Sequence, residues 1–296
     1  MGVDTATKDQ VVAAAIREIS HIATLPEITL KIIQLVEDPT STAQDLNNVI
    51  AKDPALCTRI LKVVNSAFYG LPGQIGSINR AIVLLGLNAV KNIAIAASLS
   101  KLFKGGQLTP GFSARDLWVH SITAATATKM IADKLKLGLS DESFLAGLIH
   151  DIGIMVQMQY DRNKLVEVLD KVAPSVGQTD VAPGDMMAAE LAVFGATHQD
   201  FGAALCEKWK FPKSFFHVCG YHHRPMELPA DHRTLACMVY VADRLAAEMS
   251  EGFRMDVQST NIPAEILEHL NLEPSDVDEL KQRLPEMVED AKAMLG

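Results

Sequence analysis

Histidines and aspartates occur close together at several points of this sequence, in spacings that could bind metal ions. His150 and Asp151 are adjacent and follow the apolar run Phe144–Ile149. Neighbouring residues on a helix point in different directions, so this pair can serve one metal only where the backbone is distorted, or can serve two metals that share the site. Asp116 and His120 are four residues apart and share a helix face. The further candidate donors are His198, His222, His223 and Asp243.

The donor types indicate which chemistry this group could support. Neutral imidazoles together with carboxylates suit Fe, Mn or Zn, whereas Ca²⁺ and Mg²⁺ prefer oxygen ligands. A second interpretation stays open at this point, because a buried histidine can also be satisfied by a neighbouring carboxylate without a metal. Asp116 has its own alternative, since an aspartate in the first turn after Ser113 favours the helix dipole. We expect solvated or structural roles for His21, His217, His232 and His269.

The composition predicts a globular, helical protein. Of 296 residues, 48% are hydrophobic and 21% charged, which excludes the disordered class, and only 5% are aromatic, which favours helices over sheets. The formal charge of −9 argues against broad attraction to nucleic acids or anionic membranes. We find neither a secretion signal nor a run of about 18 apolar residues, so we expect a cytoplasmic protein with reduced, buried cysteines.

Helix boundaries can be placed from caps and from glycine and proline. Asp53-Pro54 and Ser77 each open a helix in the first third of the chain. Periodic apolar residues predict later helices over 113–136, 141–159, 161–172, 185–209, 213–222 and 231–250. Gly105-Gly106 and Pro110-Gly111 form the strongest break. We therefore predict an all-α, two-lobed helical bundle with an N-terminal lobe over 1–106, a lobe with the candidate metal site over 107–255 and an acidic helical extension over 256–296.

The order of the candidate donors resembles the metal signature of the HD phosphohydrolase superfamily. His120, the pair His150-Asp151 and the distant Asp243 match its His, His-Asp and Asp positions. His198, His222 and His223 resemble the additional ligands of the related HD-GYP phosphodiesterases, which use a glutamate at the position of Asp116. The resemblance implies an HD-domain-like lobe in which Asp151 bridges two metals and acts catalytically, while the metals activate a hydroxide that attacks a phosphodiester.

The first lobe is similar to one branch of that superfamily, the HDOD family. The landmarks of the HDOD family that lie in the first lobe are Leu25-Pro26, Asp53-Pro54-Ala55-Leu56, Val64-Asn65-Ser66-Ala67-Phe68-Tyr69-Gly70, Ile78-Asn79-Arg80-Ala81-Ile82 and Leu85-Gly86. A further landmark in the second lobe is the stretch from Gly202 to Trp209 followed by Phe211-Pro212. Two positions depart from the HD-GYP enzymes. Ile154 stands where those enzymes carry a lysine, and Arg224-Pro225 replaces the acidic residue and GYP loop that follow the histidine pair.

Two functions follow from this resemblance. The first is an HDOD regulatory output module of bacterial type, which binds a protein partner or a small phosphorylated messenger and retains a metal centre. The alternative is a metal-dependent phosphohydrolase acting on a nucleotide or cyclic dinucleotide. Retention of the donors favours the enzyme, whereas Ile154 and the missing GYP loop favour the module. In both cases we expect a divalent metal centre, with Fe or Mn before Zn, and the enzyme would hold two ions, whereas the number of ions in the module stays open.

Overall fold

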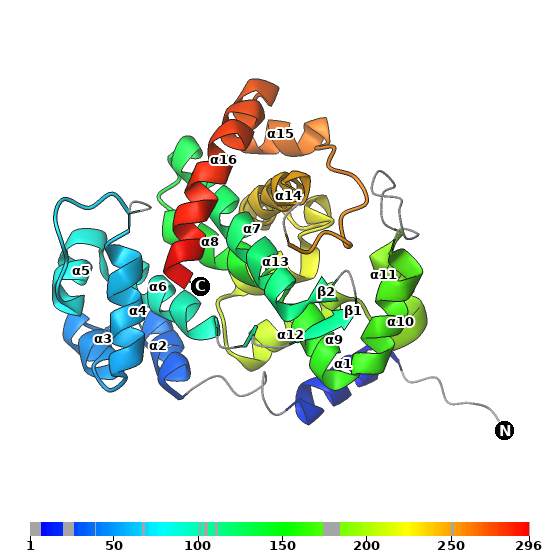
Figure 1. The fold of residues 1–296 in the computed structure, drawn as a ribbon, viewed down its shortest axis with the longest axis horizontal. Helices are drawn as coiled ribbons and strands as arrows, with labels where there is room; N and C mark the ends of the chain where they lie inside the picture. Colours follow the sequence, from blue (N-terminus) through cyan, green and yellow to red (C-terminus); the bar gives the residue numbers. More distant parts are fainter. Residues whose placement is uncertain are drawn as a thin grey trace.

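The structure, a computed structural model, describes residues 7–19, 27–38, 40–66, 69–100, 102–103, 106–109, 112–173, 184–249 and 252–295. Regular structure in this part of the chain is almost entirely helical, which confirms the predicted all-α class (Figure 1). His21, the landmark Leu25-Pro26, the pair Ala67-Phe68, the boundary residues Gly105, Pro110 and Gly111, and the loop 174–183 lie outside the described residues.

Five helices form a group on one side of the molecule (Figure 1). They are α2 (Glu27–Glu37), α3 (Ala43–Ile50), α4 (Pro54–Val64), α5 (Ile78–Leu85) and α6 (Leu87–Leu99). Their starts follow local chemistry, because the side chains of Thr42, Asp53 and Ser77 each accept a hydrogen bond from the first turn of the helix that follows. The alanine-rich helix α6 is buried along most of its length and packs against α2, α4 and α5.

Asn65 closes the loop between α4 and α5. Its side-chain amide donates to the carbonyls of Leu61 and Ile75, both at 2.8 Å, and its carbonyl accepts from the Ile75 N–H at 2.6 Å. Asn65, which belongs to the HDOD landmark Val64–Gly70, therefore has a structural role, since it holds the loop against the end of its own helix.

The second group of helices contains the candidate metal donors. A short antiparallel pair, β1 (Gln107–Thr109) and β2 (Phe112–Ser113), leads into it. Its helices are α7 (Ala114–Leu135), α8 (Ser140–Ile149), α9 (Ile152–Tyr160), α10 (Arg162–Val172), α11 (Met186–Phe194), α12 (His198–Lys208), α13 (Lys213–Tyr221) and α14 (Arg233–Glu248), with 3₁₀ turns at Pro225–Glu227 and Ala230–His232. The long helix α7 packs against both α8 and α14 at the centre of this group.

The two ends of the chain pack away from their sequence neighbours. Helix α1 (Lys8–Glu18) lies against α12 and α9, apart from α2 to α6 (Figure 1). After α15 (Ala264–Leu270), helix α16 (Pro274–Leu295) packs against α7 of the second group and α4 of the first. In the described part of the chain, no helix is long and apolar enough to cross a membrane.

Candidate metal centre

The adjacent donors His150 and Asp151 lie where the chain turns between two helices. Sequence periodicity predicts one helix over 141–159, but the structure has two, α8 and α9, with Asp151 at φ −97° and ψ 14° between them. This break is the backbone distortion that two adjacent ligands require, because it turns both side chains to the same interior. The prediction of a continuous helix was wrong at the position where the chemistry needs a bend.

Gly153 lets this turn approach the next donor closely. A Cβ atom on Gly153 would lie only 1.9 Å from the carbonyl oxygen of His198. Helix α9 therefore packs backbone to backbone against the first turn of α12, which places His198 beside Asp151.

A second helix break positions His198. The predicted helix over 185–209 is divided into α11 and α12, because Gly195 adopts a left-handed conformation at φ 80° and Thr197 then begins a new helix. Thr197 forms a capping box with Asp200. His198 is thus the first residue of α12, and Glu190 of α11 lies opposite it. The Glu190 carboxylate accepts from the His198 backbone N–H at 2.9 Å and lies 2.9 Å from its Nδ1.

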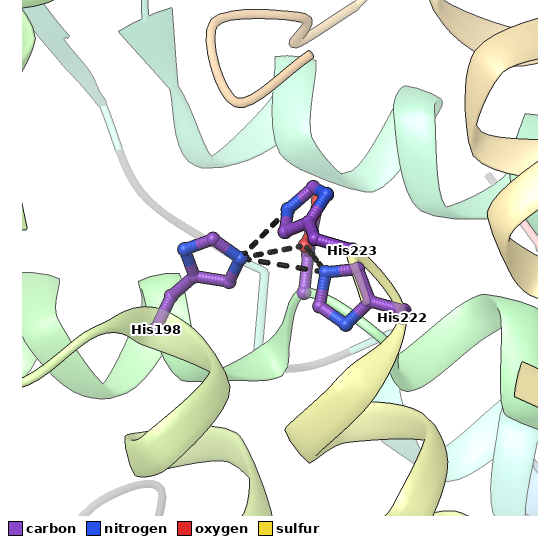
Figure 2. A group of neighbouring side chains, drawn as sticks. His198, His222 and His223 are labelled. Atoms are coloured by element: carbon purple, nitrogen blue, oxygen red, sulfur yellow. Dashed lines mark hydrogen bonds and ion pairs between the residues drawn. The ribbon is translucent and has the colours of Figure 1, made fainter. Parts of the chain in front are cut away.

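The remaining predicted donors come from three other helices. His120 lies on α7, His222 and His223 follow the last turn of α13, and Asp243 lies on α14. The amide of Gln199 links this part of the site to α12. In the amide orientation that turns its oxygen toward α13, that oxygen accepts from the backbone N–H groups of His222 and His223, both at 3.1 Å. Figure 2 shows the rings of His198, His222 and His223 facing one another from α12 and α13.

Asp151 stands between two sets of imidazoles. Its Oδ1 lies 3.2 Å from His222 Nε2 and 3.8 Å from His198 Nε2, whereas its Oδ2 lies 3.2 Å from His150 Nε2 and 3.6 Å from His120 Nε2. Within the first set, His198 Nε2 lies 3.1 Å from His223 Nε2 (Figure 2). In the second, His120 Nε2 lies 3.2 Å from Asp243 Oδ1. One carboxylate thus offers one oxygen to each of two neighbouring groups of donors.

The cluster is buried and its carboxylates lack ordinary partners. The side chains of His120, His150 and Asp151 are fully buried, and the His223 side chain is the most exposed of the predicted donors at 6%. Within the described residues, neither oxygen of Asp151 or Asp243 accepts a well-aligned hydrogen bond. Buried charges are normally paired or bound to a metal. The donor set and these unsatisfied oxygens therefore fit a metal, and the cluster could hold one.

Comparison with known proteins decides the family. A sequence profile of the HDOD domain matches residues 22–225. The chain belongs to the HDOD family. This HDOD protein is 24% identical over 259 residues to an uncharacterized protein of Treponema pallidum, a match that covers 81% of this chain but only 45% of that protein. The chain thus spans less than half of the length of that relative.

Solved structures share the fold of this HDOD protein. An HDOD domain protein of unknown function from Geobacter sulfurreducens superposes with a TM-score of 0.76 at 22% identity, covering 97% of this chain and 98% of that one. A proposed signal transduction protein from Marinobacter aquaeolei gives 0.74 at 22% identity, covering 98% and 65%. A proposed metal-dependent phosphohydrolase from Shewanella amazonensis gives 0.61 at 20% identity, covering 98% and 99%.

Protons on His150 and His198 offset the negative charge of the buried carboxylates in the metal-free cluster. Burial alone would lower the pKa of His150, but the carboxylates of Asp151 and Asp243 outweigh it and raise that pKa to about 9. Burial opposes Glu190 in the same way at His198, whose pKa is also raised to about 9. Burial lowers the pKa of His222 to about 4, and burial with the neighbouring imidazoles lowers that of His223. A divalent cation would replace the protons that His150 and His198 hold.

The structure brings together all seven side chains that the sequence singled out. These are His120, His150, Asp151, His198, His222, His223 and Asp243. Asp116 is not among them, because its carboxylate accepts from the Ser113 hydroxyl at 2.7 Å, and its backbone N–H donates to the same hydroxyl at the start of α7. The interpretation of Asp116 as a residue that stabilises the start of its helix therefore describes its side chain.

Two residues of the site escaped the sequence analysis. Glu190 pairs with His198 across a helix break, eight residues away, and the predicted continuous helix concealed that break. Asp256 lies beyond α14, in the segment assigned to the C-terminal extension, and reaches within 3.5 Å of His223 Nε2. An aspartate without a neighbouring histidine or a helical spacing gives no signal in a single sequence.

Proposed function

We propose that this HDOD protein is a regulatory module that binds a protein partner or a small phosphorylated messenger, and that its buried cluster holds two divalent metals in a structural role. The observation that carries this proposal is the burial of the metal donors away from solvent. Six of the seven donors are buried, the His223 side chain is 6% exposed, and the donors come from or adjoin helices α7, α8, α9, α12, α13 and α14. Structural metal sites are closed by protein ligands, whereas catalytic sites keep a position open for water or substrate.

The residues that would hold the metals divide between the two oxygens of Asp151. His198, His222 and His223 lie on one side and His120, His150 and Asp243 on the other. Imidazoles mixed with hard carboxylates favour Fe or Mn over Zn, which commonly takes only four ligands. Metals bound there would offset the negative charge that Asp151 and Asp243 bring into the interior, so their main contribution would be to stability.

A cavity beside the centre supports the messenger form of this proposal. It has a volume of about 620 Å³ and lies between α1, α12 and α13. Its walls carry four cations and three carboxylates, which are Lys8, Arg17, Lys208, Arg224, Asp9, Asp200 and Glu207. The Arg224 guanidinium lies 5.3 Å from the centre of the Tyr221 ring. Guanidinium groups bind phosphate well, and an aromatic ring can stack on a base. Gln199 lines the same cavity and contacts the backbone of His222 and His223. A ligand in the cavity would therefore be separated from these metal donors by the side chain of Gln199.

The alternative function is a metal-dependent phosphohydrolase. The placement of Asp151 between two donor groups favours it, because two metals held in this way activate water and stabilise charge on a phosphoryl oxygen when they are bound. Two features oppose it. Ile154 is fully buried where a phosphate-binding lysine would be expected, and Arg224-Pro225 leads into a 3₁₀ turn in place of the GYP loop.

Two measurements on the full chain test the proposal. Elemental analysis of protein purified without chelators should find close to two equivalents of Fe or Mn per chain, and His150→Ala should lose metal. Hydrolysis of bis(p-nitrophenyl) phosphate with added Fe²⁺ or Mn²⁺ should then be equal for the wild type and Asp151→Ala. Turnover by the wild type that disappears in Asp151→Ala would favour the hydrolase, and a folded wild type without metal would overturn the metal centre.

A further inference from the structure

The loop that follows α14 is fixed against the first turns of α7. Gly252 adopts φ 78°, and a Cβ atom there would lie 2.6 Å from the carbonyl oxygen of Asp116 and 2.8 Å from the backbone nitrogen of His120. The backbone N–H of Phe253 donates to the same Asp116 carbonyl at 3.1 Å. Only glycine permits this approach, so the sequence at 252 brings the loop directly onto the turn that carries His120.

Phe253 packs between this loop and the candidate metal site. Its side chain is 1% exposed, its ring meets that of Phe112 edge to face at 5.3 Å, and it lies 6.3 Å from the ring of His120. The loop is therefore packed in place by an aromatic contact and a backbone hydrogen bond. Asp256, three residues further on, is directed into the interior by this packing.

The Asp256 carboxylate has no visible reason to be buried other than the cluster itself. Its side chain is completely buried, and within the described residues neither of its oxygens accepts a hydrogen bond. An oxygen of Asp256 lies within 4.8 Å of ligand atoms of both His120 and Asp243. An uncompensated carboxylate next to another carboxylate is costly to bury, so it requires a cation for balance.

We infer that Asp256 is a metal ligand, and that it supplies from a loop the carboxylate that the HD-GYP pattern would place on α7. The inference rests on the proposed metal centre and extends it. With Asp256, one subsite contains His120, His150, Asp243 and Asp256, the other contains His198, His222 and His223, and Asp151 lies between them. The first is rich in carboxylates and the second in imidazoles. Because carboxylates suit harder ions such as Mn²⁺ and imidazoles suit Fe or Zn, the two subsites should prefer different metals.

Metal stoichiometry tests this assignment without any assay of activity. In separate samples, the full chain and its Asp256→Asn variant are stripped with EDTA, reloaded with Mn²⁺ or with Zn²⁺, freed of excess metal and measured by mass spectrometry. The wild type should retain two equivalents of either metal. Asp256→Asn should retain only one equivalent of Mn²⁺. Asp116→Asn is the matched control, because it neutralises the helical acid that lies outside the cluster, and it should bind both metals as the wild type does.

Thermal unfolding provides a second measurement that distinguishes a ligand from a packing residue. In EDTA, Asp256→Asn should unfold at a temperature equal to or above that of the wild type, since a neutral amide replaces a buried carboxyl group that has no hydrogen-bond partner. In Mn²⁺ the order should reverse, because the variant loses the stabilisation that the ion provides. Equal Mn²⁺ in the two proteins, or an Asp256→Asn variant that is destabilised equally with and without Mn²⁺, would overturn the role of Asp256 alone. A wild type that binds neither metal would overturn the metal centre as well.

Discussion

At the scale of single residues, the cluster is a group of acids and bases that must share charge in a dry interior. His150 and His198 hold protons more tightly than free histidine because of Asp151 and Glu190, with pKa values raised from 6.5 to about 9. A raised pKa in the folded state stabilises the protein fully below the unfolded pKa of 6.5, and this stabilisation is lost as the pH rises through 9. The raised pKa of Asp256 acts in the same direction.

The metal-free protein should therefore lose stability between pH 6.5 and 9. Urea unfolding in EDTA should show a fall in the free energy of unfolding on the order of a few kcal/mol across this range. Glu190→Gln should reduce the fall, because Glu190 is the main group that raises the pKa of His198. Glu207→Gln changes an exposed carboxylate on α12 and serves as the control.

A free energy of unfolding that rises with pH in EDTA would contradict the assigned protonation. Loading with metal should weaken the dependence, since metal replaces the protons.

The sequence alone revealed a metal donor where two donors are adjacent or where a family motif includes the donor. His150-Asp151 and His222-His223 are adjacent, and the resemblance to HD proteins linked them to His120, His198 and Asp243. Asp116 had an equally good spacing, but the Ser113 hydroxyl takes its carboxylate. Asp256 had no such spacing. It lies in a loop whose position depends on Gly252 and Phe253, which contact α7. Contacts of this kind between distant segments leave no period in the sequence.

At the scale of elements, helix starts could be predicted and interior breaks could not. Asp53 and Ser77 start helices through side-chain hydrogen bonds to residues three positions later, so the signal is local. The breaks at His150-Asp151 and at Gly195 interrupt apolar periodicity that continues on both sides. Tertiary packing maintains them, above all the contact between α9 and α12 at Gly153.

This contact leads to a prediction about Gly153→Ala. The added methyl group would overlap the His198 carbonyl, which is backbone and cannot rotate away, so α9 and α12 must separate. We expect destabilisation of about 3 kcal/mol or more by urea unfolding, the upper part of the range for overpacked cores. Metal binding should also fall, because the shift moves His198 away from Asp151. Gly76→Ala is the control, since a Cβ there has no neighbour within 4 Å, and its stability should change little. Wild-type stability in Gly153→Ala would show that the two helices can adjust.

At the scale of the whole molecule, the ends of the chain connect parts that the order of the sequence separates. Helix α1 packs on α12 and lines the cavity next to the metal donors, although the sequence suggested that it belongs with the first lobe. The sequence predicted a helical extension over 256–296, but the helical pattern of a segment does not specify the surface on which it packs. The predicted boundaries at 106 and 255 remain predictions, and the second falls between Phe253 and Asp256, which act together in one loop.

Helix α16 provides a test of whether the two helix groups depend on each other. Its buried residues Leu280, Leu284 and Val288 lie on the helix that contacts both α7 and α4. Leu284→Ala should cost about 2 to 5 kcal/mol, the usual range for a buried leucine. Because Leu284 lies outside the cluster, metal stoichiometry should remain at the wild-type value. Gln282→Ala, on the exposed face, should leave both quantities unchanged. Cooperative unfolding at a lower urea concentration, measured by circular dichroism, would show that α16 joins the groups into one folding unit, whereas two separate transitions would show that the metal-containing group is stable alone.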